Sequence, residues 1–367
     1  MEKINVLYYN TSLLKGGTDA YMREVVANIN HKKFQVDVVI KDGETVDEYM
    51  LEVLKNAGAN VYLAKGTLKE RLAFIVKLLK QTKGHYQVMH INATSQATGL
   101  IAHFAKKYGK IPKVIFHSHM GGNDNGRGIA DIIGTRMMFK NSDKLVSCSN
   151  VASVFMYGQK YVNNHEVEIL NNSVDLKKFD FNKETRKKVR ASLGISDKTF
   201  VVLHVGRFAP QKNHKLLINV FNQMLKEDKN AKLMLIGDGV LMDDVYKQVK
   251  ELKIGKSVMF LGLQNNVSDF MQAADCFVMT SLHEGFPIVS VEAQAAGLPC
   301  VLSGNISSEA NLCDNVSFVG LNESLKNWAD TILEAKRMTR VSNKEILEQR
   351  GFDKKSAIKR IEKIYSE

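Results

Sequence analysis

The sequence predicts an α/β protein built from two Rossmann-like, doubly wound parallel-sheet domains. Three observations support this fold class. The chain has 367 residues, and a single hydrophobic core rarely grows beyond about 250–300 residues. Short apolar, β-branched runs alternate with longer segments of helical periodicity throughout both halves. Each half also opens with a strand that runs into a glycine-bearing turn, LYYNTSLLKGG in the first and VVLHVGRFAPQKN in the second.

The alternating runs give the expected order of elements. Strands are expected at Ile4–Tyr9, Val36–Ile40, Val61–Leu63, Val88–Ile91, Val114–Phe116, Leu145–Cys148, Val167–Leu170, Phe200–Val205, Lys232–Ile236, Val258–Leu261, Cys276–Thr280 and Cys300–Leu302. Helices are expected between them, for example at Tyr21–Asn30, Leu68–Lys80, Lys215–Lys226 and Val267–Ala274. Strands that alternate with helices in this way form parallel sheets covered by helices on both faces.

The join between the domains is expected near residues 171–188, NNSVDLKKFDFNKETRKK, where apolar periodicity stops and polar residues cluster. This predicts a first domain over residues 1–175 and a second over residues 176–351. Phe352–Tyr365 has the pattern of an amphipathic helix, with Ile358, Ile361 and Ile364 on one stripe. In open parallel sheets, ligands bind outside the carboxyl ends of the strands. The sequence therefore predicts an active site in a cleft between two facing domains.

Composition excludes several classes of protein. Hydrophobic residues make up 44% and charged residues 25% of the chain, the mix of a folded globular protein. No uncharged apolar run approaches the ~18 residues that span a bilayer. The net charge of +12 is shared equally between the halves. With 8% aromatic residues and no recognition motif, a nucleic-acid partner is not expected.

The cysteines and the N-terminus indicate the compartment. Cys148, Cys276, Cys300 and Cys313 form no CxxC pair, so neither a disulfide scaffold nor a zinc site is expected. The opening MEKINVLYYN lacks the small-residue cleavage site of a signal peptide. A cytoplasmic protein is expected.

The segment richest in chemistry is residues 281–299, SLHEGFPIVSVEAQAAGLP. Pro287 suits the first turn of a helix, so backbone N–H groups near Gly285 and Phe286 would form an anion site at its N-terminus. Glu284 precedes this helix and can accept hydrogen bonds from sugar hydroxyls, and Glu292 in the second turn can bind a ribose diol. The competing interpretation is that both carboxylates only complement the helix dipole.

Two further turns carry groups suited to phosphate. Arg207 and Lys212 follow a strand, five residues apart, and offer a planar fork and a point charge to a diphosphate. Gly16 and Gly17 follow the first strand and would let backbone amides approach a phosphate or substrate. Taken alone, the first turn could be a solvated basic loop and the second a plain loop.

Together these features resemble the retaining glycosyltransferases of family 4 (group 1), which have the GT-B fold, and among them bacterial capsular and exopolysaccharide enzymes. Glu284 and Glu292, followed by EAQAAGLP, match the E-x7-E motif of that family, and Arg207 with Lys212 matches its diphosphate-binding pair. The resemblance covers nearly the whole chain. It also includes the glycine loop, the turn Gly237-Asp238-Gly239, the interdomain Asn172-Ser173-Val174-Asp175 and a C-terminal helix that crosses back onto the first domain.

The resemblance implies a role for each matching position. Glu284 would bind the hydroxyls of the donor sugar and Glu292 the ribose, while Arg207 and Lys212 would neutralise the leaving diphosphate. The segment from Leu261 to Val267 would lie along the base. The full donor-binding set implied is Gly16, Gly17, Arg207, Lys212, Gly237, Leu263, Val267, Glu284, Gly285, Phe286, Pro287, Ile288 and Glu292.

The family also places a first-domain histidine near the donor sugar. His117 and His119 follow an apolar strand and share one face of it, because side chains alternate along a strand. His117 is favoured by its position directly after the strand, with His119 as the competitor. The implied role is a hydrogen bond that orients the sugar. Asp19 stands where the family commonly has Glu, so an acceptor-side contact there would be altered.

The implied reaction is transfer of a sugar, with retention, from a nucleotide-diphosphate donor, expected to be a UDP-sugar, to a hydroxyl of a saccharide or lipid-linked acceptor. No metal or other cofactor is expected, because Arg207 and Lys212 would stabilise the leaving group. The first-domain loops at residues 15–21, 95–97 and 120–128 would form the acceptor pocket. The alternatives are a sugar-nucleotide epimerase of the GT-B fold and a non-catalytic, glycosyltransferase-like partner subunit that binds nucleotide.

The largest local excess of positive charge lies between Lys65 and Lys113, with ten Lys or Arg and one acidic residue. Within it, the segment 68–83 sets Leu68, Leu72, Ile75 and Leu79 on one stripe and its basic residues elsewhere. One interpretation is a helix that rests on the inner face of the cytoplasmic membrane, bound to anionic lipid. The other, slightly favoured, is an ordinary Rossmann helix with a solvated basic face.

Overall fold

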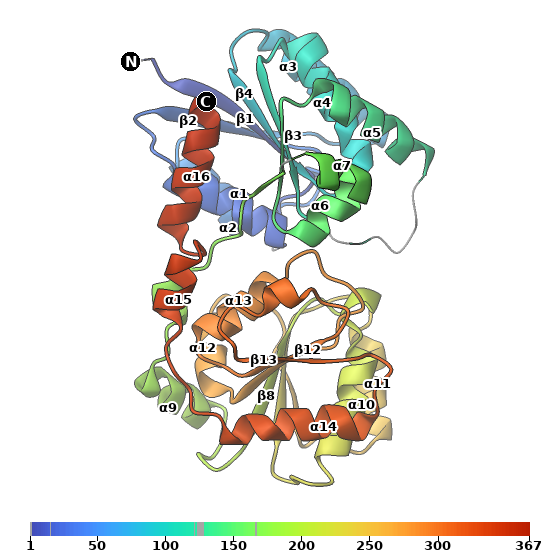
Figure 1. The fold of residues 1–367 in the computed structure, drawn as a ribbon, viewed down its shortest axis with the longest axis vertical. Coiled ribbons are helices and arrows are strands. Elements are labelled where there is room, and N and C mark those ends of the chain that lie inside the picture. The colour runs from blue at the N-terminus through green and yellow to red at the C-terminus, as the bar shows by residue number, and fades with distance from the viewer. Residues whose placement is uncertain (1, 15, 121, 123–127, 166) are drawn as a thin grey trace. The chain divides into compact units, whose positions relative to one another are not determined.

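The computed structural model describes residues 2–14, 16–120, 122, 128–165 and 167–367. The chain divides into two compact units (Figure 1). Unit 1 spans residues 1–173 and 354–367, and unit 2 spans residues 174–353. Each unit holds one parallel sheet, with seven strands in unit 1 and six in unit 2. The predicted fold class of two Rossmann-like domains is confirmed.

The sheet of unit 1 has the strand order β3-β2-β1-β4-β5-β6-β7. The strands are β1 Ile4–Asn10, β2 Phe34–Ile40, β3 Val61–Leu63, β4 Val88–Ala93, β5 Lys113–Ser118, β6 Lys144–Ser147 and β7 Glu168–Ile169. The helices are α1 Gly17–Asn28, α2 Glu48–Asn56, α3 Leu68–Gln81, α4 Gly99–Phe104, α5 Ile129–Asn141, α6 Asn150–Tyr157, α7 Gln159–Asn164 and α16 Lys354–Ser366, with short helical segments η1 Gln96–Thr98 and η2 Ala105–Gly109. The strand order therefore reverses between β1 and β4, which are parallel neighbours in the sheet.

The sheet of unit 2 has the order β10-β9-β8-β11-β12-β13. The strands are β8 Val201–Val205, β9 Lys232–Ile236, β10 Val258–Phe260, β11 Cys276–Met279, β12 Cys300–Ser303 and β13 Val316–Val319. The helices are α8 Leu176–Phe179, α9 Lys183–Ser192, α10 His214–Met224, α11 Met242–Glu251, α12 Val267–Ala273, α13 Ile288–Ala295, α14 Leu325–Glu334 and α15 Lys344–Gln349, with short turns η3 Pro210–Lys212, η4 Ser308–Ala310 and η5 Ala335–Arg337. This is the doubly wound order in which the ligand crevice lies where the order reverses, here between β8 and β11.

Helix α16 is the last element of the chain, yet it packs in unit 1 (Figure 1). Its predicted apolar stripe, Ile358, Ile361 and Ile364, is buried in the same core cluster as residues of β1 and α1. The backbone N–H of Asn30 donates to Glu362 Oε1 at 2.8 Å, which ties the loop after α1 to this helix. The first unit is therefore completed by the C-terminal segment.

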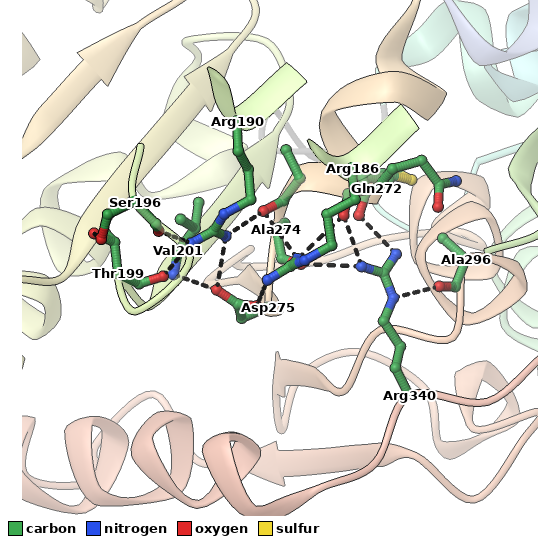
Figure 2. A network of polar contacts seen from close by, with 12 residues as sticks. Arg186, Arg190, Ser196, Thr199, Val201, Gln272, Ala274, Asp275, Ala296 and Arg340 are labelled. Atoms are coloured by element: carbon green, nitrogen blue, oxygen red, sulfur yellow. Dashed lines mark hydrogen bonds and ion pairs between the residues drawn. The ribbon is translucent and has the colours of Figure 1, made fainter. Parts of the chain in front are cut away.

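Three arginines hold the C-terminal end of α12 and the start of β11 (Figure 2). Arg186 and Arg190 both pair with Asp275, at 2.6 and 3.3 Å. Arg340 donates to the carbonyls of Met271, Gln272, Ala274 and Ala296. Because the carbonyls of a helix's last turn lack partners within the helix, these donors satisfy them. The network thereby anchors the N-terminal end of β11, whereas the C-terminal end of this strand leads into Glu284.

The structure differs from the sequence-based expectation at two places. Strand β13 was not expected, and it lies at the edge of the sheet, where two of its four residues are half-buried and one is exposed. Helix α1 begins at Gly17, within the expected glycine loop. Asp19 explains this early start: its carboxylate accepts hydrogen bonds from the backbone N–H groups of Leu14 at 3.0 Å and Gly16 at 3.2 Å, and so caps the helix.

Candidate active site

The turns that follow β8 and β11 lie side by side at the switch point of unit 2. The backbone N–H of Leu282 donates to Gln211 O at 2.8 Å. The Gln211 side chain donates to His283 O at 2.9 Å, and the Thr280 hydroxyl donates to Asn213 O at 3.0 Å. These cross-links hold together two loops that are about 70 residues apart in sequence, so that the predicted basic turn meets the predicted acidic one.

Lys212 and Glu284 are the predicted site residues that the structure brings into direct contact. Lys212 Nζ lies 2.6 Å from Glu284 Oε1, and the two side chains are 17% and 9% exposed. Charge-assisted hydrogen bonds of this length are among the strongest in proteins, and partial burial reduces screening by water. The pair therefore presents an oriented ammonium and an oriented carboxylate next to each other at the switch point.

Arg207 differs from Lys212 because its side chain is exposed, and among the described residues no carboxylate pairs with it. The turn that carries it lies against the turn after β9. The backbone N–H of Phe208 donates to Asp238 O at 2.9 Å. A Cβ on Gly237, at φ 142°, would lie 2.0 Å from Gly206 O, so this approach requires glycine. The guanidinium is thus free to bind an anion beside a platform of two packed backbone turns.

Helix α13 begins at Ile288, with Pro287 at its N-cap and Gly285 and Phe286 just before it. Glu292 is the fifth residue of this helix, hence in its second turn. Burial raises the pKa of the Glu292 carboxyl to about 7, and the charge of Lys178 opposes this only in part. Among the described residues no side chain hydrogen-bonds this carboxyl. A half-buried acid with an elevated pKa and no hydrogen-bond partner among the described side chains is a candidate for binding a ligand.

The segment predicted to lie along the base follows β10. Gly237 N–H donates to Gly262 O at 2.9 Å, so this loop joins the turn after β9. Leu263 is 61% exposed, and Val267 begins α12. The turns after four neighbouring strands therefore meet at the carboxyl edge of the unit 2 sheet.

His214, the first residue of α10, was not predicted as a site residue from the sequence. It is 2% exposed, its ring stacks on Phe208 with 4.1 Å between centroids, and neither ring nitrogen has a partner among the described residues. Burial, aided by the charge of Lys212, lowers the pKa of His214 to about 4. The ring is therefore neutral at physiological pH, and it packs below the basic turn without competing with Lys212 for anions. No local pattern distinguishes it in the sequence.

In unit 1, the carboxylate of Asp19, which stands where the resembled family commonly has Glu, is engaged by internal hydrogen bonds. Asp19 is 1% exposed. Its carboxylate accepts hydrogen bonds from Asn10 Nδ2 at 2.7 Å and from the Ser12 hydroxyl, besides capping α1. Because four internal donors occupy this carboxylate, Asp19 is a structural residue that shapes the loop around Gly16.

The two predicted histidines follow β5 and lie together, with ring centroids 4.0 Å apart. His117 is fully buried, and its Nδ1 lies 3.1 Å from His90 Nε2. His119 is half-buried and its Nε2 lies 2.9 Å from Asn92 Oδ1. Burial lowers the pKa of His119 to about 3, and both burial and the neighbouring rings lower that of His117. Exposure favours His119 over His117 as the ring that meets a ligand.

Two other predicted features fall partly outside the described residues. In the expected acceptor loops, Lys15, Gly121 and residues 123–127 are not described.

Among the described residues, no cluster of three or more His, Cys, Asp or Glu residues has the arrangement of a metal site. None of the described helices is long and apolar enough to cross a membrane.

Comparison with known proteins identifies the class. Residues 185–345, most of unit 2, match the family described as Glycosyl transferases group 1. The resemblance of the sequence to the group 1 glycosyltransferases is therefore confirmed for this segment.

Relatives extend the similarity to the whole chain. EpsF of Bacillus subtilis (strain 168), provisionally assigned as a glycosyltransferase, is 28% identical over 98% of this chain and 96% of its own. The UDP-Gal:alpha-D-GlcNAc-diphosphoundecaprenol alpha-1,3-galactosyltransferase of Escherichia coli is 26% identical over 94% of this chain and 89% of its own. The crystal structure of Anabaena HepE in complex with UDP and glucose has a TM-score of 0.82 at 19% identity and covers 99% of both chains. This last likeness confirms the fold.

Proposed function

We propose that this protein transfers a sugar, with retention of configuration, from a UDP-sugar to a hydroxyl of a lipid-linked or saccharide acceptor in surface polysaccharide assembly. The observation that carries the proposal is the contact of Lys212 with Glu284 at the switch point of unit 2, on the same turn that carries the exposed Arg207. Two cations suit a diphosphate, and the carboxylate beside them suits sugar hydroxyls. The E. coli relative is named for a UDP-sugar donor and a diphosphoundecaprenol acceptor, which favours the same substrate classes here.

The geometry also favours a particular mechanism. Glu284 lies 2.6 Å from Lys212 Nζ, and a carboxylate neutralised in this way is a poor nucleophile, so a covalent glycosyl-enzyme on Glu284 is disfavoured. In a front-face reaction, the bond from the anomeric carbon to the β-phosphate oxygen breaks while the acceptor oxygen bonds to the same face. The acceptor proton passes to the departing phosphate. Positioning and stabilisation of the diphosphate by Lys212 and Arg207 then provide the catalysis.

Thermal unfolding with nucleotides tests this proposal. A ligand at ~100 times its Kd stabilises the folded protein by about 2.7 kcal/mol, which raises Tm by about 5 °C or more for a domain of this size. We expect UDP and one UDP-sugar to produce this shift in EDTA, and Lys212→Ala to abolish it. That UDP-sugar should then serve as donor in a transfer assay with lipid-linked acceptors.

The two alternatives give different results in the same experiment. A non-catalytic partner subunit would bind UDP without transferring sugar to any acceptor. An epimerase would convert the bound UDP-sugar without an acceptor. If no nucleotide raises Tm, or if EDTA abolishes the effect, the proposed metal-free donor site is wrong.

Glu292 predicts a pH dependence of donor binding. The ionised carboxylate accepts two ribose hydroxyls, whereas the protonated form accepts them poorly, so binding favours the ionised form. With a pKa of about 7, the affinity should be low below pH 7 and high above it, with a change of about tenfold between pH 6 and pH 8. Calorimetry with UDP-glucose, which has no phosphate that titrates in this range, should show the change in wild type and not in Glu292→Gln. If the affinity for UDP-glucose changed with pH equally in both proteins, Glu292 would be excluded from the site.

We propose that α5, and not α3, is the element that contacts the membrane. Most of the stripe expected to face lipid on α3 is instead turned to the core: Ile75 and Leu79 are fully buried, Leu72 packs against them, and only Leu68 is exposed. On α5, Ile129, Ile132 and Ile133 are 79%, 66% and 50% exposed. The opposite face of α5 packs against η1 so closely that a Cβ on Gly134 would lie 2.1 Å from Gln96 O.

Vesicle flotation tests this assignment. The exposed basic residues Arg136 and Lys140 accompany the isoleucines on α5, which suits an anionic bilayer. Burial of one isoleucine is worth about 1.5–3 kcal/mol, so Ile129→Ser with Ile132→Ser should weaken binding to phosphatidylglycerol vesicles by at least about tenfold. The matched control is Val240→Ser in unit 2, where the side chain is 87% exposed. Equal flotation of both variants, or binding lost only when Lys69, Lys77 and Lys80 become Glu, would overturn the role of α5.

A further inference from the structure

A chain of hydrogen bonds runs through the core of unit 1 from the C-terminal helix to His117. The Tyr365 hydroxyl, on α16, lies 2.9 Å from His90 Nδ1. His90 Nε2 in turn lies 3.1 Å from His117 Nδ1. All three side chains are at most 2% exposed. His117 Nε2, the far end of the chain, has no partner among the described residues.

The positions of the protons in this chain follow from counting donors. The three groups are uncharged: burial raises the pKa of Tyr365 and lowers those of His90 and His117. The Tyr365 hydroxyl has no other partner among the described residues, so its proton is used only if it is donated to His90 Nδ1. A buried donor left unpaired is strongly unfavourable. His90 then carries its proton on Nε2 and donates it to His117 Nδ1, and the proton of His117 must be on Nε2.

A second hydrogen-bond network fixes the tautomer of His119, so that its free ring nitrogen is an acceptor. Its Nε2 faces Asn92 Oδ1 at 2.9 Å, and an amide oxygen only accepts, so Nε2 carries the proton. The amide of Asn92 is itself oriented, because its Nδ2 donates to Asn10 Oδ1 at 3.1 Å and Tyr8 donates to its Oδ1 at 3.0 Å. His119 Nδ1 is therefore an acceptor, and it too has no partner among the described residues.

We propose that Tyr365 is a positioning residue for the sugar site, because it sets, through His90, the tautomer that makes His117 a hydrogen-bond donor beside His119 as an acceptor. A group that meets both rings must accept one hydrogen bond and donate another, which is the chemistry of a hydroxyl. The ligand class is thus a sugar hydroxyl, and only this part rests on the proposed function. The consequence is that the last helix of the chain takes part in substrate recognition by the first unit.

Nitrogen-15 NMR of the histidine rings tests the proposal without any substrate. In ¹⁵N-histidine-labelled protein, the ring shifts report which nitrogen carries the proton, and His90→Gln and His117→Asn assign the signals among the 10 histidines. We expect wild-type His90 and His117 each to be protonated on Nε2 alone. In Tyr365→Phe no donor reaches His90 Nδ1, so neither tautomer of the pair is favoured and both should be populated.

The matched control is Tyr86→Phe. Tyr86 is also buried in unit 1, but its hydroxyl donates to Asp37 Oδ2 at 2.8 Å and not to a histidine. This variant should keep the wild-type tautomers. In a transfer assay, Tyr365→Phe should lower kcat by about tenfold, the value of one hydrogen bond of ~1.4 kcal/mol, with little change in KM for the donor.

Three results would overturn the proposal: His117 protonated on Nδ1 in the wild type, unchanged tautomers in Tyr365→Phe, or the same change in Tyr86→Phe. The first of these does not require Tyr365→Phe, so it decides the matter even if that variant does not fold. The expected tautomers in a protein that transfers no sugar would overturn the proposed function while supporting the role of Tyr365 in setting them.

Discussion

Replacing Glu284 by glutamine is expected to slow sugar transfer by about 10²–10³-fold, the range seen when one preorganised polar group of an active site is removed, and at the same time to tighten the binding of UDP. The carboxylate is 9% exposed and holds Lys212 Nζ at 2.6 Å. Glutamine removes the charge that would accept hydroxyls of the donor sugar, and the sugar loses its position. The same change frees the ammonium of Lys212 for the diphosphate.

The gain in UDP affinity should be about fivefold, because a partly exposed ion pair is worth about 1 kcal/mol. Single-turnover transfer measures the first effect, and calorimetry with UDP measures the second. Lys212→Ala should act in the opposite sense on UDP, with a loss of affinity. The control is Glu345→Gln, which removes an exposed carboxylate from α15 and should change neither quantity. Weaker UDP binding in Glu284→Gln would mean that the pair acts as a unit to bind nucleotide.

The fold could be predicted because its signal is local. Strands of a parallel sheet are buried on both faces and appear as continuous apolar runs. Runs such as Val36–Ile40 and Lys232–Ile236 therefore identified β2 and β9 with errors of at most two residues. Strand β13 carries a weaker signal because it is an edge strand, with one residue exposed and two half-buried.

The candidate site could be predicted only in part, because its decisive contacts are long-range. Each of the two loops that carry Lys212 and Glu284 could be found from its own residue pattern and from the family resemblance, but their contact depends on the strand order, which places β8 beside β11. The sequence also does not show that four internal donors surround the carboxylate of Asp19. The contact of Tyr365 with His90 joins residues 275 positions apart, and no periodicity indicates it.

Helix α3 is a second case in which the sequence alone could not decide between two interpretations. Its apolar positions were visible in the sequence, but a helical stripe has the same appearance whether it faces a core or a membrane. The structure decides between the two, because Ile75, Leu78 and Leu79 pack in the core with β1 and β4. For the same reason, the sequence did not distinguish the exposed isoleucines of α5 from core positions.

Replacing Arg190 by methionine is expected to lower the free energy of unfolding of unit 2 by about 3 kcal/mol, the low end of the cost of breaking a buried ion pair. Arg190 is 1% exposed. Its guanidinium donates to Ala273 O at 2.8 Å, to Ser196 O at 2.6 Å and to Thr199 O at 2.5 Å, besides its contact with Asp275 (Figure 2). Methionine fills the volume of the stem but leaves these carbonyls without a donor.

The loss should appear as a shift of the urea midpoint rather than as a change of fold. Asp275 keeps Arg186 at 2.6 Å and the backbone N–H of Val201 at 2.8 Å, so its charge is still compensated in the variant. With a slope of about 2 kcal/mol per molar urea, the midpoint for unit 2 should fall by about 1.5 M. Lys187→Met, on the exposed face of the same helix α9, is the matched control and should stay within about 0.5 kcal/mol of wild type. If the two variants were equally stable, the anchoring of β11 would have to come from Arg186 and Arg340 alone, and Arg340→Met would then carry the full effect.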